Sequence, residues 1–144
     1  MVRVSQPLRT PVLALAASCL LAGTAAAAQW RVVPGATDLE IDVGSLQQER
    51  TRASAWLRWW GRPALVPELA TWGPRSPRVV RTATQVEFDC GHATVRTLAV
   101  HAYGSNGAPV FMTGIAGPAL PVQGADLLWA YDAVCEAARS GSRL

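Results

Sequence analysis

The chain has 144 residues, with 13 basic residues, all of them arginine, against 10 acidic ones. This length suits one domain and excludes large enzyme scaffolds such as a (β/α)₈ barrel, which needs about 250 residues. The lack of lysine excludes Schiff-base catalysis by a lysine and a phosphate-binding loop of the Walker type.

The N-terminal segment has the pattern of a secretory signal peptide. Arg3 and Arg9 form a positively charged start, an apolar run follows over residues 11–22, and four alanines occupy residues 25–28. The apolar run is shorter than the about 20 residues that a membrane-spanning helix needs. We therefore expect residues 1–28 to be a signal peptide and residues 29–144 to form a single domain.

Such a signal peptide would export the domain to the periplasm or out of the cell. Cys19 lies in a poor match to a bacterial lipoprotein cleavage site, so an outer-membrane lipoprotein is the alternative, and we expect membrane contact only if Cys19 is lipidated. Cleavage removes two of the 13 arginines and no acidic residue, which leaves a net charge of +1. Because the remaining arginines are dispersed along the chain, we expect no nucleic-acid binding.

Cleavage also changes the cysteine count. Without Cys19, two cysteines remain, Cys90 and Cys135, in a chain sent to an oxidising compartment where disulfides persist. Two cysteines allow one intramolecular pairing, so the sequence predicts a Cys90–Cys135 disulfide.

The first half of the domain is predicted to alternate between short strands and turns. Residues 30–33 favour a strand that Pro34-Gly35 stops, and residues 39–43 alternate apolar and acidic side chains as a half-buried strand does. Gly44-Ser45 is predicted to turn the chain. Residues 53–60 are predicted as a third strand, with a helix as the alternative because alanine and leucine favour helices.

The middle of the chain contains one irregular stretch and two strong strands. Residues 61–77 contain four prolines, which prevent a continuous helix or strand. Residues 78–90 predict the clearest strand of the chain, because their side chains separate into two faces. One face comprises Val80, Thr82, Thr84, Val86, Phe88 and Cys90, and the opposite, polar face comprises Arg81, Gln85, Glu87 and Asp89. Gly91-His92 is predicted as a tight turn into a partner strand over residues 93–103.

A hairpin and a helix are predicted to complete the domain. Asn106-Gly107 favours a type I′ turn, because both residues tolerate a positive φ angle, and a strand over residues 110–115 follows. The last element is predicted as a helix that ends near Gly141. Its apolar stripe comprises Leu127, Leu128, Tyr131, Val134, Cys135 and Ala138.

These elements predict an α+β domain, in which an antiparallel meander sheet of about six strands packs against one C-terminal helix. Cys135 lies on the apolar stripe of the predicted helix, and Cys90 lies on the apolar face of its predicted strand. The predicted disulfide therefore links the helix to the sheet on the faces that must meet.

A search for catalytic residues gives two histidines without a recognisable motif. His92 follows Asp89-Cys90-Gly91, but the predicted disulfide removes the Cys90 thiolate as a ligand or nucleophile. His101 lies in a predicted strand, and no serine stands at a spacing that marks a catalytic triad. Motifs for metalloproteases, α/β-hydrolases, phosphate loops and dinucleotides are absent from the sequence. We therefore expect no enzyme activity, cofactor or metal.

The tryptophan content is the unusual feature of the chain, which has six. Trp56, Trp59 and Trp60 cluster with Arg58 and Arg62. If residues 53–60 form a strand, Trp56, Arg58 and Trp60 share a face opposite Trp59. Exposed tryptophan and arginine are typical of binding hot spots, so Trp56, Arg58, Trp60 and Arg62 form the candidate binding surface. The alternative is that Trp59 is core and the other rings merely cover a small sheet.

The mature chain resembles the surface-adhesin protein E family, which comprises small exported or lipid-anchored proteins of Gram-negative bacteria. The resemblance covers most of residues 30–135, and it rests on Trp30, Ile41-Asp42, Phe88-Asp89-Cys90, Arg96, Tyr103-Gly104, Gly107 and Ala133-Val134-Cys135. It implies an antiparallel sheet with a helix tied to it by a disulfide, and it implies dimers. It also implies an adhesin that contacts host extracellular-matrix and serum proteins, but no ligand-binding residues carry over to this sequence.

The sequence therefore favours an exported, non-enzymatic, adhesin-like envelope protein that binds a host or envelope macromolecule. Two alternatives remain open. One is a small periplasmic hydrolase that uses His92 or His101 with a carboxylate. The other is a structural periplasmic protein that forms a homodimer through its Trp-rich segment.

Overall fold

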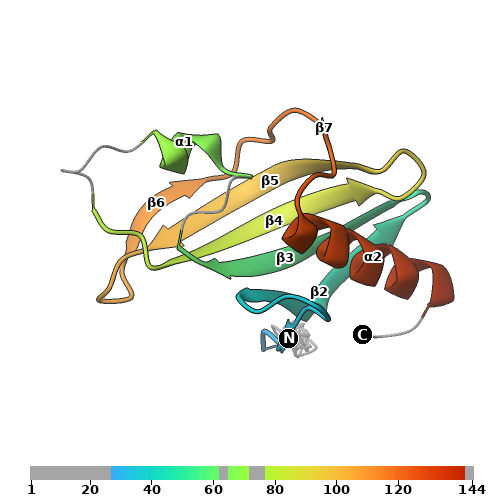
Figure 1. Ribbon diagram of the computed structural model, residues 1–144, viewed down its shortest axis with the longest axis horizontal. Helices are drawn as coiled ribbons and strands as arrows, with labels where there is room; N and C mark the ends of the chain where they lie inside the picture. The colour runs from blue at the N-terminus through green and yellow to red at the C-terminus, as the bar shows by residue number, and fades with distance from the viewer. Residues whose placement is uncertain (1–26, 62–64, 72–76, 142–144) are drawn as a thin grey trace, which may run out of the picture.

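The computed structural model describes residues 27–61, 65–71 and 77–141, so residues 1–26, which include Cys19 and nearly all of the predicted signal peptide, lie outside the described residues. Six antiparallel strands follow one another across a single sheet in chain order, and a seventh pairs with the fifth. The strands are β1 (Trp30–Val32), β2 (Leu39–Glu49), β3 (Arg52–Trp60), β4 (Arg81–Asp89), β5 (Thr94–Tyr103), β6 (Pro109–Thr113) and β7 (Leu120–Pro121). This meander confirms the predicted fold class (Figure 1).

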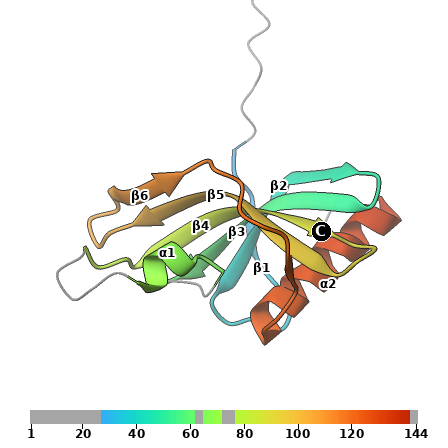
Figure 2. The ribbon, with the colours of Figure 1, turned by 90° about the horizontal axis from the view of Figure 1, so that it is seen from above.

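Both helices of the described chain lie on one side of the sheet, which we call the inner face (Figure 2). The long helix α2 (Ala125–Ser140) covers β2, β3 and β4 at one end, and the short helix α1 (Pro67–Ala70) packs at the other. Side chains alternate between the two faces of a strand. The predicted inward residues of β3 are accordingly buried: Ala53, Ala55, Leu57 and Trp59.

The disulfide between Cys90 and Cys135 is present, as predicted, and it joins the end of β4 to α2 with 5.7 Å between the Cα atoms. Beside it, the Tyr131 hydroxyl donates a hydrogen bond to the Cys90 carbonyl at 3.0 Å. The predicted apolar stripe is wrong at Leu128, which is 46% exposed, whereas Ala130 is buried. The side of α2 that faces the sheet therefore includes Ala130 in place of Leu128, and this small residue allows the helix to lie close to the sheet.

Helix α1 corrects the expectation of a wholly irregular stretch over residues 61–77. Pro67 stands in its first turn, where its missing N–H costs no helical hydrogen bond. Val66 and Leu69 pack against Val79 and Val100 in a second, smaller core. This core covers the end of the inner face that α2 does not reach.

The expected turn at Gly44-Ser45 is wrong, because β2 continues through it to Glu49. The register with β3 shifts between Asp42 and Gln47, so several residues bulge out of the ladder there. Asp42 and Ser45 stabilise the detour: Asp42 Oδ1 accepts the Gly44 N–H at 3.1 Å, and Ser45 Oγ accepts the Trp56 N–H at 2.9 Å. These side-chain hydrogen bonds replace the missing backbone hydrogen bonds of the ladder, so β2 continues past the bulge.

The expected type I′ turn at Asn106-Gly107 is also wrong. Gly107 has a φ of 76°, but Asn106 does not have a positive φ, and the Gly107 N–H donates to the Gly104 carbonyl at 3.0 Å. A type I′ turn needs a positive φ at both central residues. The Asn106 side chain instead accepts the Ala108 N–H at 3.0 Å, so it stabilises a longer loop.

Candidate functional site

The face of the sheet opposite the helices, which we call the outer face, carries the predicted binding residues. No helix in residues 27–61, 65–71 and 77–141 packs on it (Figure 2). Trp56, Arg58 and Trp60 lie on this face, and Trp59 lies on the inner face, as the alternation predicted. Arg62, the fourth predicted residue, lies outside the described residues.

Arg58 is held in place from both sides. Its Cζ atom lies 4.3 Å from the ring centroid of Trp30, and its Nε lies 2.5 Å from Glu40 Oε2. Glu40 is the ladder partner of Arg58 on β2, so the pairing of strands creates this ion pair. The charge of Arg58 is therefore neutralised within the sheet, and its side chain ties the edge strand β1 to β3.

Trp56 meets a histidine from a strand two positions away. The rings of Trp56 and His101 have centroids 4.9 Å apart and are tilted by 44°. Ala83 of β4, the ladder partner of both Arg58 and His101, is buried although it faces outward. Because its methyl group is short, the larger side chains from the flanking strands meet above it.

A row of three side chains crosses the sheet beside this pair. Trp60, Arg81 and Tyr103 are ladder partners in β3, β4 and β5, and we call them the Trp60 row. The Cζ atom of Arg81 lies 4.9 Å from the ring centroid of Tyr103, and Trp60 is 63% exposed. Met112 of β6, 57% exposed, is the ladder partner of His101. An exposed indole thus stands next to a guanidinium that rests on an aromatic ring.

Arg81 and Tyr103 were not predicted as members of this surface. The alternation in residues 78–90 placed Arg81 on the polar face of its strand, but it could not say which residues flank that position. Only the register between strands brings the arginine between a tryptophan and a tyrosine. The contact between Trp30 and Arg58 was not predicted either, because β2 separates β1 from β3 along the chain.

The other end of the outer face is charged and has a different character. Glu87 Oε1 lies 2.9 Å from Arg96 Nε and 3.6 Å from Arg52 Nη1, so one carboxylate serves two guanidinium groups. Asp89 Oδ2 lies 3.1 Å from His92 Nδ1 at the adjoining turn. The hydrogen bond from the His92 side chain, with help from the Gly91 N–H, lowers the pKa of Asp89 below its ordinary 3.8.

The two histidines considered for catalysis have different surroundings. His92 is exposed on the β4–β5 turn and is paired with Asp89, and its neighbour Cys90 is consumed by the disulfide. His101 lies on the outer face against Trp56. Among the residues that the structure describes, no group of three or more histidine, cysteine, aspartate or glutamate side chains is placed to hold a metal ion.

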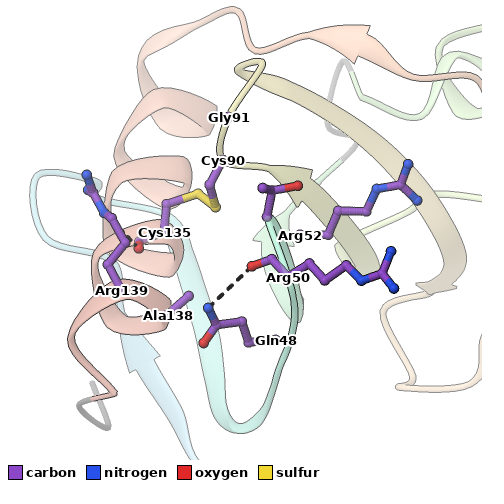
Figure 3. A pocket seen from close by; sticks show the side chains of 9 residues that line it. Gln48, Arg50, Arg52, Cys90, Gly91, Cys135, Ala138 and Arg139 are labelled. Carbon is purple, nitrogen blue, oxygen red and sulfur yellow. Dashed lines mark hydrogen bonds between the residues drawn. A yellow bond between two sulfur atoms is a disulfide. The ribbon is translucent and has the colours of Figure 1, made fainter.

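A pocket of about 250 Å³ lies beside the disulfide, where the β2–β3 turn approaches α2 (Figure 3). The disulfide and Ala138 form part of its lining, and Gln48 Nε2 donates a hydrogen bond to the Arg50 carbonyl at 3.5 Å. In Figure 3 the side chain of Arg50 extends away from the disulfide, whereas Arg139 runs back along α2, and its Nε donates a hydrogen bond to the Cys135 carbonyl at 3.2 Å. The pocket therefore offers apolar surface near the sulfur atoms, with the Arg139 side chain held against the helix at its rim.

Comparisons with known proteins support the fold. No family model matches the chain, and no curated protein matches its sequence. Among solved structures, a crystal structure of Haemophilus influenzae protein E is similar, with a TM-score of 0.54 and 10% sequence identity over 76% of this chain and 89% of that chain. This similarity is one of fold, and it agrees with the architecture that the family resemblance implied.

No helix in the described part of the chain is both long and apolar enough to cross a membrane.

Proposed function

We propose that this chain is an exported, non-enzymatic binding protein of the bacterial cell envelope. It binds a macromolecular partner through the aromatic end of its outer face, which we define as Trp56, Trp60, Arg81, His101, Tyr103 and Met112. The observation that carries the proposal is the exposure of Trp60 beside Arg81 on a sheet face without a covering helix in the described chain.

The physical argument concerns the cost of such a surface. Trp60, at 63% exposure, leaves a large apolar area in water, from which folding gains little. Trp59, the neighbour of Trp60, is by contrast nearly buried under the helices. Tryptophan and arginine are enriched in the residues that dominate binding energy at interfaces. The aromatic end is thus explained better as a surface that a partner covers than as part of the core.

Two further observations support a role in the envelope. The first 28 residues have the pattern of a signal peptide, and the fold is similar to that of Haemophilus influenzae protein E. A location in the periplasm or outside the cell follows from the signal peptide. A lipid anchor on Cys19 remains the alternative to a freely secreted form.

The rival hydrolase function has less support from the geometry. A histidine acting as a general base needs a nucleophile within hydrogen-bond reach and a group that orients it. His92 has an orienting carboxylate in Asp89, but the thiol next to that turn is oxidised. His101 has the Trp56 ring as its neighbour. Substituting His92, which lies outside the aromatic end, with alanine is therefore expected to leave binding through Trp60 in place.

The proposal is tested with protein purified from the periplasm of an expression host, so that export and disulfide formation occur first. Binding to immobilised extracellular-matrix and serum proteins is measured by biolayer interferometry for wild type, Trp60→Ala and Leu128→Ala. Leu128 is the matched control, because it is an exposed apolar residue on the helix side of the molecule. We expect the Trp60→Ala variant to lose about tenfold or more in affinity and the control to lose none. Equal binding by all three proteins contradicts the proposal.

A homodimer formed through the Trp-rich face is separated from this function by light scattering after size exclusion. A monomer that binds a partner supports the proposal. A dimer that Trp60→Ala converts to a monomer, with no partner bound by either protein, supports the structural alternative.

A further inference from the structure

The Trp60 row differs from the rest of the outer face in the state of its arginine. Arg58 is paired with Glu40, and Arg96 and Arg52 share Glu87. Arg81 forms no ion pair with a carboxylate among the described residues, and its contact is with the Tyr103 ring. Among the described residues, therefore, no carboxylate neutralises the positive charge at this end of the sheet.

From this arrangement we propose that the Trp60 row binds an acidic polysaccharide, with the Trp60 indole stacked on a sugar ring and the Arg81 guanidinium paired with a carboxylate or sulfate of the same chain. The inference rests on the proposed function, in which this end of the outer face is the binding surface. It adds the chemical class of the partner.

The geometry suits a chain of sugar rings because the row runs across three adjacent strands on one face of the sheet. Its three residues belong to adjacent strands, which lie about 4.8 Å apart, so the row extends about 10 Å across the sheet. The exposed face of an indole packs against the C–H groups of a sugar ring. Trp60 supplies such a ring at one end of the row, and Arg81 lies next to it.

The chemistry of the guanidinium favours an anion over a neutral sugar. An arginine presents its N–H groups in a plane that matches the two oxygens of a carboxylate, and such charge-assisted pairs are stronger than neutral hydrogen bonds. The ring of Tyr103 restrains the Arg81 side chain before any ligand arrives, so less rotamer entropy is lost on binding. The Glu40 carboxylate in the neighbouring ladder does not compete, because Arg58 already binds it.

A protein partner is a weaker match to the same observations. A stable protein interface has an apolar core and buries about 800 Å² on each partner. Next to Trp60 on the adjacent strand is the Arg81 guanidinium, and the Tyr103 phenol follows one strand further, so the row carries a charge and a hydroxyl beside its one exposed indole. A polysaccharide needs only the row itself, and its acidic groups complement the charge.

The test measures binding of three defined probes by isothermal titration calorimetry at low ionic strength. Oligogalacturonate carries carboxylates, a heparin oligosaccharide carries sulfates as well, and maltohexaose is neutral. We expect at least one acidic probe to bind, more weakly as salt is added, and maltohexaose not to bind measurably. The relative affinities of the two acidic probes identify which acidic group is preferred.

Substitutions then locate the site. Trp60→Ala and Arg81→Gln are each expected to weaken binding of the acidic probe about tenfold or more, and Trp60→Phe retains most of the affinity because it keeps an aromatic ring. Arg96→Gln is the matched control, since it removes the same charge from the charged end of the same face. Thermal unfolding of each variant verifies that it is folded.

Three results would overturn the inference: no binding of either acidic probe, equal binding of maltohexaose, or equal losses in the Arg81→Gln and Arg96→Gln variants. If the acidic probes fail while Trp60→Ala still abolishes binding to a protein partner, the choice of ligand is wrong and the proposed function stands. If Trp60→Ala affects no partner of any kind, both are wrong.

Discussion

Removal of the disulfide is the perturbation whose magnitude follows most directly from the structure. The bond closes a loop with a sequence separation of 45 residues. In the chain-entropy model, a loop of this length lowers the free energy of folding by about 4 kcal/mol, because the cross-link restricts the unfolded chain. Domains of this size have a total stability of about 5–15 kcal/mol. The Cys90→Ala/Cys135→Ala variant should therefore lose a large part of its stability.

The native structure itself should change little in this variant. Cys135 is 2% exposed and is packed in the core beside Val134, so alanine there removes only one buried sulfur atom. The end of β4 and α2 also remain joined by the hydrogen bond from the Tyr131 hydroxyl to the carbonyl of residue 90. The loss thus arises mainly in the unfolded state, which becomes more expanded.

Urea unfolding followed by circular dichroism measures this loss for the oxidised protein, the reduced protein and the double variant. We expect the free energy of unfolding to fall by about 4 kcal/mol and the m-value to rise, because more surface is exposed in an unlinked unfolded chain. Tyr131→Phe, with the disulfide intact, should cost only about 1 kcal/mol. A loss below about 1 kcal/mol with an unchanged m-value would refute the entropic reasoning for this loop.

Two further predictions concern local geometry and pH. Gly35→Ala should destabilise the protein by about 2–3 kcal/mol in urea unfolding, because Gly35 has a φ of 90° and a Cβ there would lie 2.9 Å from the Trp129 ring. Gly107→Ala is the control: Gly107 has a φ of 76° but open space around it, so this substitution should cost only about 1 kcal/mol. Since the His92 hydrogen bond lowers the pKa of Asp89 below 3.8, the unfolded chain takes up this proton first as the pH falls. Asp89→Asn should therefore destabilise the protein at about pH 6, and the difference from wild type should shrink toward about pH 2, where an unchanged difference would contradict the pKa assignment.

The structure changes the interpretation of the predicted binding surface. Trp56, Arg58 and Trp60 do share a face, but they have different surroundings. Arg58 is engaged by Trp30 and Glu40, so its main effect is to hold the edge of the sheet. The guanidinium next to the exposed tryptophan belongs to Arg81, which comes from another strand and has no carboxylate partner among the described residues. A mutation at Arg58 is therefore expected to report on stability, and one at Arg81 on binding.

Much of the fold was predictable from local pattern. Alternation with a period of two identified the inward residues of β3 and β4, since a strand buries every second side chain. The count of cysteines outside the predicted signal peptide predicted the disulfide. Two of the errors fell where side chains replace backbone partners: Ser45 and Asp42 carry β2 through an apparent turn, and Asn106 stabilises a loop in place of a tight hairpin turn. The local sequence pattern does not predict these side-chain hydrogen bonds to the backbone.

By itself, the sequence determined which side chains of β3 and β4 lie on each side of the sheet, that a helix follows the strands, and that Cys90 pairs with Cys135. It could do so because strand alternation, helical periodicity and cysteine pairing are properties of the chain read along its length. Only the tertiary structure decided that Trp60, Arg81 and Tyr103 form one row. Register is set when whole faces pack against the helices, so neighbours across the sheet are fixed by the core beneath them and not by their own identity.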